Sequence, residues 1–157
     1  MNNPLYDTLF GCHQGKTSPF LELADGTFMN HTAYLELAAQ YAHVFTKLGL
    51  KPEDRVAVQI GKSPEALAVY AACVQAGLVF LPLNTAYTAS EVSYFVENSG
   101  ARLLLCDDTK AEALAPVAAA TGAALETLND DGSGSFTDLA NPMPTSFPTV
   151  VRTEADL

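Results

Sequence analysis

The residues that could perform chemistry in this chain are few, and two short patterns among them resemble the end of a phosphate-binding loop. Gly15-Lys16-Thr17 has Phe10 where that loop requires its first glycine, and no strand is predicted before it. Gly61-Lys62-Ser63 does join a predicted strand to a helix N-terminus, where backbone N–H groups can meet an anion. Val56 stands in place of the required glycine, however, so neither pattern predicts a phosphate cradle.

The titratable side chains also provide few candidates for catalysis or metal binding. Asp107-Asp108 follows a predicted strand, and a carboxylate pair at that edge of a sheet could act as an acid or base. The same residues can cap the next helix, which is the interpretation we favour. His13 and His31 lie near turns and His43 lies in a predicted helix, without neighbours at zinc-ligand spacing, so we expect surface or capping roles. We therefore predict no catalytic residue and no metal site in the chain.

Composition excludes several classes of protein. The chain has 157 residues, 48% of them hydrophobic, which predicts one globular domain. Its 8 Lys and Arg against 18 Asp and Glu give a net charge of −10, and the basic residues are scattered, so nucleic acid is not an expected partner. Cys12, Cys73 and Cys106 are widely spaced and the N-terminus lacks signal-peptide character. We expect reduced cysteines and a cytoplasmic location.

The stretch from Ala66 to Leu83 is apolar enough to suggest a membrane span. Gly77 and Pro82 divide it, and Glu65 stands at its start. We therefore expect a buried helix followed by a buried strand, and no membrane partner.

Apolar periodicity and capping residues predict a repeat of strands and helices. The first part of the chain predicts a short helix, a hairpin around Asp25-Gly26 and a long helix, at residues 5–10, 19–30 and 32–48. Strands are then predicted at residues 55–60, 79–83, 101–107 and, more weakly, 124–128. The helices between them begin at Ser63, at a Thr88–Glu91 capping box and at Asp107 or Asp108, and end at Gly77, Gly100 and Gly122, the last of them despite Pro116. This order predicts an α/β fold with a mainly parallel sheet and flanking helices.

Ligands of such sheets bind beyond the carboxyl ends of the strands. Gly61–Ser63 and Asn84–Thr88 lie there, so Lys62, Ser63, Asn84 and Tyr87 are the candidates for ligand contact. Asn84 and Tyr87 can alternatively form a turn and pack against the following helix. The Gly- and Pro-rich segment 129–157 reads as a surface excursion, with GSGS at 132–135 as a flexible loop.

The stretch AGLVFLPLNTAYTASEVSYFVENSGARLLLCD, residues 76–107, resembles the early region of the adenylate-forming acyl-CoA synthetases. The preceding GLKPEDRVAVQIGKSPEALAVYAACVQAG is similar to the same family, and the resemblance covers nearly the whole chain. PLNTAYT, LLLCDD and ALETLNDDGSGSFTDL look most like the malonate-activating subgroup. The resemblance implies an α/β N-terminal subdomain at 1–128 and, at 129–157, an excursion leading toward a phosphate-binding loop that would follow.

For a full-length member, the resemblance implies a ligase that uses ATP and Mg²⁺ to convert malonate or a close relative into an acyl-adenylate, and then transfers the acyl group to coenzyme A. The family's phosphate loop, adenylate-contacting segment, ribose-binding aspartate and C-terminal lysine have no matching motif in this chain. We therefore expect the 157 residues alone to be inactive and to self-associate through exposed apolar surface. Two alternatives stay open: a free-standing flavodoxin-like interaction module, and a small oligomeric enzyme that uses Asp107 or Asp108.

Overall fold

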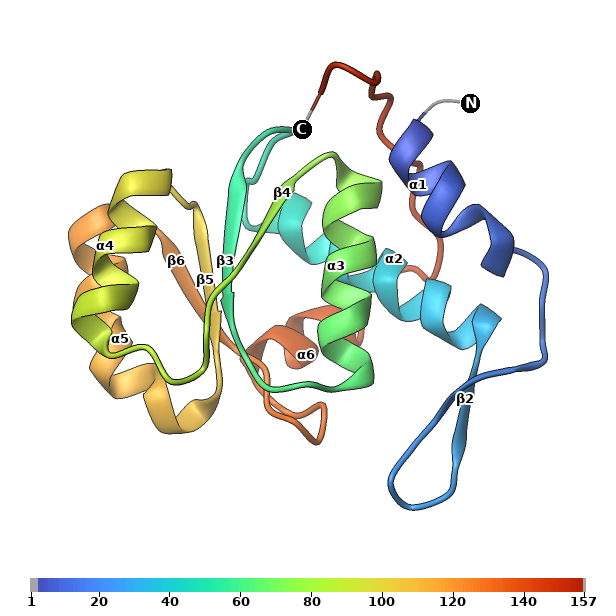
Figure 1. Ribbon diagram of the computed structural model, residues 1–157, viewed down its shortest axis with the longest axis horizontal. Helices are drawn as coiled ribbons and strands as arrows, with labels where there is room; N and C mark the ends of the chain where they lie inside the picture. Colours follow the sequence, from blue (N-terminus) through green and yellow to red (C-terminus); the bar gives the residue numbers. More distant parts are fainter. Residues whose placement is uncertain (1–2, 157) are drawn as a thin grey trace.

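The computed structural model describes residues 3–156 and folds into three layers, with a sheet between two layers of helices (Figure 1). In chain order the elements are α1 (Pro4–Leu9), the 3-10 helix η1 (Gly11–His13), β1 (Pro19–Glu22), β2 (Phe28–Asn30), α2 (His31–Lys47), β3 (Arg55–Gln59), α3 (Pro64–Ala76), β4 (Val79–Pro82), α4 (Ala89–Ser99), β5 (Leu103–Cys106), α5 (Asp108–Thr121), β6 (Ala124–Thr127) and α6 (Ser135–Ala140).

The main sheet has the strand order β4-β3-β5-β6, and every neighbouring pair in it is parallel. Val56 of β3 stands in register with Phe80 of β4 on one side and with Leu103 of β5 on the other. Parallel neighbours need a long crossover, and α3, α4 and α5 provide the three connections. The predicted α/β fold with a parallel sheet is confirmed.

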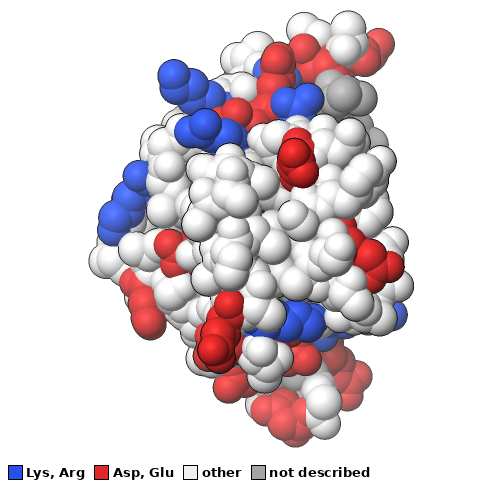
Figure 2. Space-filling model, turned by 90° about the vertical axis from the view of Figure 1, so that its left-hand side faces the viewer, with Lys and Arg blue, Asp and Glu red and all other residues white. Residues whose placement is uncertain are grey.

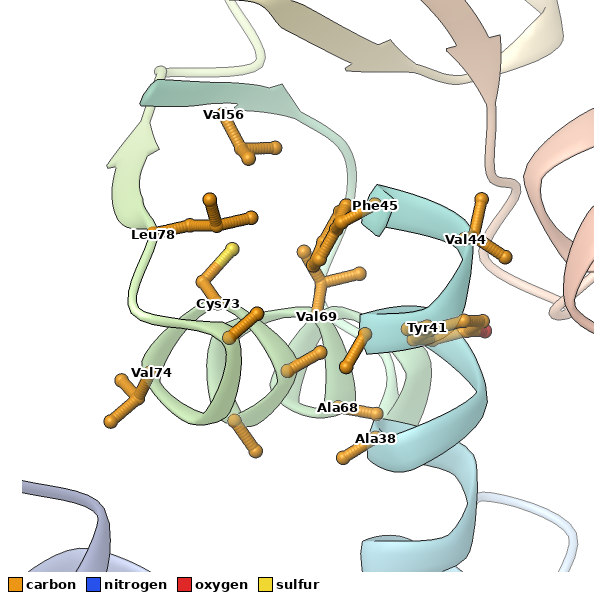
Figure 3. Close-up of a cluster of buried hydrophobic side chains, with 14 of the residues drawn as sticks. Ala38, Tyr41, Val44, Phe45, Val56, Ala68, Val69, Cys73, Val74 and Leu78 are labelled. Atoms are coloured by element: carbon orange, nitrogen blue, oxygen red, sulfur yellow. The ribbon is translucent and has the colours of Figure 1, made fainter. Parts of the chain in front are cut away.

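Two apolar cores lie on the two faces of the sheet. Helices α2, α3 and α6 cover one face, where Val69 and Cys73 of α3 and Phe45 of α2 point toward Val56 (Figure 3). Helices α4 and α5 cover the other face, and their core includes Leu104 from the centre of β5. Successive residues of β3 and β5 are therefore buried on opposite faces, which explains why these strands read as continuous apolar runs.

The helix ends follow the capping signals in the sequence. The Ser63 hydroxyl accepts a hydrogen bond from the Ala66 N–H at 3.1 Å, and α3 ends at Gly77 with φ +71°. Thr88 and Glu91 form the predicted capping box at the start of α4. The apolar stretch 66–83 is divided between α3 and β4, as expected. Among the described residues, no helix is long and apolar enough to cross a membrane.

The β1–β2 hairpin stands apart from the main sheet (Figure 1). Its strands are antiparallel, and its turn closes through hydrogen bonds from the Leu23 N–H to the Thr27 carbonyl and from the Gly26 N–H to the Leu23 carbonyl, at 2.8 and 2.9 Å. The Asp25 carboxylate accepts the Thr27 N–H at 2.9 Å, and Gly26 has φ +81°. The predicted hairpin is confirmed.

Two features of the tail were not predicted. Residues 135–140 form α6, and Phe136 is fully buried between Tyr41 and Phe45, with ring centroids 4.9 and 5.6 Å away. The segment after α6 then runs back along α2 and α3, where Gln75 donates its side-chain amide to the Phe147 carbonyl at 3.0 Å and accepts the Val150 N–H on its backbone carbonyl at 2.9 Å. The tail therefore contributes to the main core.

Charged groups do not form a continuous patch on the face over α4 and α5. Figure 2 shows this face with uncharged side chains at its centre and scattered Lys, Arg, Asp and Glu around them. No basic stripe of the kind that binds a phosphate backbone is visible on this face.

Candidate functional site at the carboxyl ends of the strands

One buried side chain, Gln59 at the end of β3, joins this strand to the loop that follows β4. Gln59 is 1% exposed, and its amide donates hydrogen bonds to the Asn84 and Tyr87 carbonyls, both at 2.9 Å. Its Oε1 atom has no hydrogen-bond partner among the described residues. Gln59 therefore sets the position of the β4–α4 loop relative to the sheet.

Lys62 and Ser63 lie in the loop between β3 and α3. The Ser63 hydroxyl is used as the cap of α3, while the Lys62 side chain is exposed. Lys62 lines two neighbouring depressions, which we call the apolar groove and the acidic cleft.

The apolar groove has a volume of about 540 Å³ and runs between α3 and β4. Leu67 and Tyr70 of α3 line one side, and Phe80 and Pro82 of β4 line the other. Because β4 pairs with β3 alone, the groove follows a free edge of the sheet. The groove therefore presents apolar side chains along that edge.

The acidic cleft, of about 510 Å³, lies between the β1–β2 hairpin, the start of α3 and the loop after β6. Its charged lining comprises Glu22, Asp25, Glu65, Asp130, Asp131 and Lys62. The Asp130 carboxylate lies directly against Gly61, where a Cβ atom would clash with it. Five carboxylates against one ammonium group make the cleft repel a polyphosphate.

Asn84 and Tyr87 both make contacts within their own segment. The Asn84 side-chain oxygen accepts the Ala86 N–H at 2.9 Å, and the Tyr87 ring stacks on Phe95 with centroids 5.2 Å apart. The four candidate residues therefore lie at the carboxyl ends of neighbouring strands, but they do not line one common cavity.

Asp107 and Asp108 are engaged locally. Burial raises the pKa of Asp107, but hydrogen bonds from Thr109 and Lys110 and the Lys110 charge, 3.1 Å away, outweigh it and leave the pKa below its usual value. Hydrogen bonds, led by the one from Asn129, lower the pKa of Asp108 as well. Asp107 occupies the N-cap position of α5, although its side chain makes no hydrogen bond to the helix backbone. Both carboxylates stay ionised at neutral pH, which suits a structural role better than a general acid.

The expectation that each histidine is a surface or capping group is wrong for His13. His13 is buried, and its Nδ1 atom lies 2.7 Å from Nδ1 of His31. His43 instead approaches the Ser146 carbonyl through Nε2 at 2.8 Å. The reason for the error is tertiary, because a hairpin brings the first two histidines together. Within residues 3–156, no group of three or more His, Cys, Asp or Glu is placed to hold a metal ion.

Two connecting residues were missed by the sequence reasoning, Gln59 and Asn129. Asn129 accepts the Asp108 N–H on its side-chain oxygen at 2.9 Å and donates its amide to the Asp108 carboxylate at 2.8 Å. A polar residue at the end of an apolar strand was the available signal for Gln59, since such a group needs a partner when buried.

The parallel sheet and its strand-end loops agree with a sequence match to the family of AMP-binding enzymes over residues 12–151. The chain therefore belongs to that family. Among solved structures, it is similar to MatB from Rhodopseudomonas palustris, with 40% identity and a TM-score of 0.95 over 100% of this chain and 31% of that one. MatB has been solved both without ligand and with ATP bound.

Relatives known by sequence are more varied. The crotonobetaine/carnitine–CoA ligase of Escherichia fergusonii is 27% identical over 154 residues, covering 91% of this chain and 30% of that enzyme. A nonribosomal peptide synthetase of Emericella nidulans, inpB, is 31% identical over 136 residues, covering 87% of this chain and 6% of that protein. The chain thus spans less than a third of the length of MatB and of these relatives.

The residues present do not fit an assembled site for ATP and Mg²⁺. A triphosphate requires several cations or converging N–H groups, whereas Lys62 is the one cation among the residues that line the two depressions, and Lys110 is already paired with Asp107. The carboxylates of Asp107 and Asp108 are already bound to neighbouring side chains. We derive no step of adenylation from this chain's own residues.

Proposed function

We propose that this chain serves as the N-terminal part of an ATP-dependent acid–CoA ligase. Such an enzyme condenses a carboxylate with ATP, releases pyrophosphate, and transfers the acyl group from the adenylate to the thiol of coenzyme A. The observation that carries the proposal is the likeness to MatB along the whole chain, at a TM-score of 0.95. Membership of the AMP-binding enzyme family supports the use of ATP.

The proposed acid is malonate or a close relative. The likeness to MatB, a malonyl-CoA synthetase, supports this choice, as does the resemblance of the PLNTAYT and LLLCDD segments to that subgroup. Mg²⁺ and coenzyme A are proposed for the longer enzyme on the same ground.

The proposed contribution of these residues is structural. They supply a parallel sheet, two cores and the apolar groove, against which the parts of the enzyme that hold ATP would pack. The negative charge of the acidic cleft agrees with a structural role for this chain and with ATP binding by other parts of the enzyme, because the cleft repels phosphate groups.

Two proteins test the proposal. The 157-residue chain alone should form no malonyl-CoA from malonate, ATP and coenzyme A, because it lacks an assembled phosphate site. A chimera in which this chain replaces the matching 31% of MatB should form malonyl-CoA. The assay follows thioester formation by chromatography.

MatB without its first third is the control and should be inactive. Thioester formation by the isolated chain would overturn the proposed scaffold role. A folded chimera that binds no ATP would show that this chain cannot take the place of the first third of MatB, and would favour a separate interaction module.

A further inference from the structure

The contact between His13 and His31 joins two segments that are separated by the whole hairpin. His13 ends η1 and His31 begins α2, and their Nδ1 atoms lie 2.7 Å apart. Two ring nitrogens at this distance need a single proton between them, with one ring donating and the other accepting. The contact is therefore made by two neutral rings or by one neutral and one charged ring, but not by two imidazolium rings.

The surroundings of His13 oppose a second positive charge. The ring is 8% exposed, and the rings of Phe20 and Tyr34 pack against it with centroids 4.5 and 5.4 Å away. The charges that act on it are those of His31 and Lys16, which are both cationic when protonated. Burial first, and then these two groups, lower the pKa of His13 below its ordinary value of 6.5.

The other titratable groups near this cluster keep the same charge while His13 is protonated. The Tyr34 hydroxyl donates to the Leu67 carbonyl of α3 at 3.2 Å, and Tyr70 of α3 also lies near Tyr34. Burial raises the pKa values of Tyr34 and of Tyr6 in α1, so both phenols stay neutral. In the hairpin, hydrogen bonds from Thr27 hold the pKa of Asp25 below its usual value, so Asp25 stays ionised as His13 titrates.

The hairpin is attached to α2 close to this contact. Phe20 of β1 packs on both Tyr34 and His31 of α2, with centroids 4.9 Å from each ring. At its base, the His31 N–H donates to the Ser18 carbonyl at 3.3 Å and the Thr32 N–H donates to the Lys16 carbonyl at 3.1 Å. The tip of the hairpin forms one wall of the acidic cleft.

We propose that the contact between His13 and His31 is an acid-sensitive clasp. It holds the β1–β2 hairpin against α2 while a single proton lies between the two Nδ1 atoms, and it releases the hairpin when both Nδ1 atoms are protonated and neither can accept. Release loosens the wall that the hairpin supplies to the acidic cleft. The inference is independent of the proposed ligase role, because it concerns the opening of a segment of this chain.

The sign of the pH dependence follows from linkage. The folded pKa of His13 lies below that of the open state, so the open state takes up the proton first as the pH falls. The closed hairpin therefore keeps its full stability above about pH 6.5 and loses it as the pH falls toward the folded pKa. One additional proton in the open state gives at most a change of about tenfold in the opening equilibrium per pH unit.

Amide hydrogen exchange on the complete chain, corrected for intrinsic rates, measures this opening between pH 7.5 and 5.5. We expect protection of the Leu23 and His31 amides to fall severalfold, with the steepest change below about pH 6.5. Amides of β3 and β5 should keep their protection. In His31→Gln, a neutral side chain faces His13, so the pH dependence should become shallower while protection at pH 7.5 is retained.

His43→Gln is the matched control, because it removes the third histidine and leaves the pair intact; it should keep the wild-type pH dependence. Equal pH dependence in the wild type and His31→Gln would overturn the clasp. So would unchanged hairpin protection down to pH 5.5, or a loss of protection that is shared equally by β3 and β5. Imidazole ¹⁵N shifts give a second readout: a pair that shares one proton should show one protonated and one unprotonated Nδ1 at pH 7.5.

Discussion

At the scale of single residues, Gln59 links strand β3 to the loop after β4. It stands at the end of a buried strand and donates to two carbonyls of the next strand's loop, at 2.9 Å each. Removal of its amide would leave the Tyr87 carbonyl without this donor, whereas the Asn84 carbonyl would keep the Tyr87 N–H at 3.0 Å. A buried polar group that loses its hydrogen-bond partner lowers the free energy of unfolding by about 1–3 kcal/mol.

We predict that Gln59→Ala lowers the free energy of unfolding by about 1–3 kcal/mol. Urea titration followed by circular dichroism measures the change, and hydrogen exchange should show faster opening at residues 84–88. Gln14→Ala is the control, since Gln14 is exposed and should change stability by less than about 0.5 kcal/mol. An effect of Gln59→Ala no larger than that of the control would contradict the role assigned to Gln59.

At the scale of elements, α6 shows that the Gly- and Pro-rich tail is part of the folded unit. Phe136 is fully buried against Tyr41 and Phe45 of α2, although Gly132 and Gly134 precede it closely in the chain. The two glycines allow the chain to turn with positive φ, at +80° and +131°, and to deliver the phenylalanine to the core.

We expect Phe136→Ala to lower the free energy of unfolding by about 3–5 kcal/mol, because it leaves a cavity beneath α2. Phe28→Ala in the hairpin is the matched control, since Phe28 is 58% exposed and its removal should cost little. Chemical denaturation of both variants tests the prediction. A Phe136→Ala protein as stable as Phe28→Ala would mean that α6 is not part of the cooperative core.

At the scale of the whole molecule, the apolar groove runs along the edge of the sheet that β4 forms. Leu67, 45% exposed, and the side chains of Tyr70 and Phe80 lie along it. Apolar surface of this kind marks a region that other protein normally covers. In the proposed ligase, the remaining parts of the enzyme would provide that cover.

We predict that the isolated chain self-associates at high concentration and binds an apolar dye, because the groove is open to solvent within residues 3–156. Leu67→Glu should shift sedimentation velocity profiles toward the monomer. Tyr94→Glu, which changes an exposed aromatic side chain on α4 instead, should leave the association unchanged. A strictly monomeric chain without dye binding would contradict this prediction.

Local patterns in the sequence were sufficient for most of the fold. The strand-helix repeat, the capping box at Thr88 and the glycine at the end of α3 are signals contained within a few neighbouring residues, and the structure confirms each. The resemblance to the adenylate-forming enzymes was likewise readable from short segments, and the family match agrees with it.

Only the tertiary structure decided which polar groups meet. The contact of His13 with His31 spans 18 positions in the chain, the bond from Gln59 to the Asn84 carbonyl spans 25, and α6 is held by residues of α2. Such contacts depend on how helices and sheet pack, because side chains distant in sequence become neighbours only when burial of the cores brings their elements together. The sequence by itself therefore determined most of the elements and the family, whereas packing decided α6, the clasp, the acidic cleft and the apolar groove.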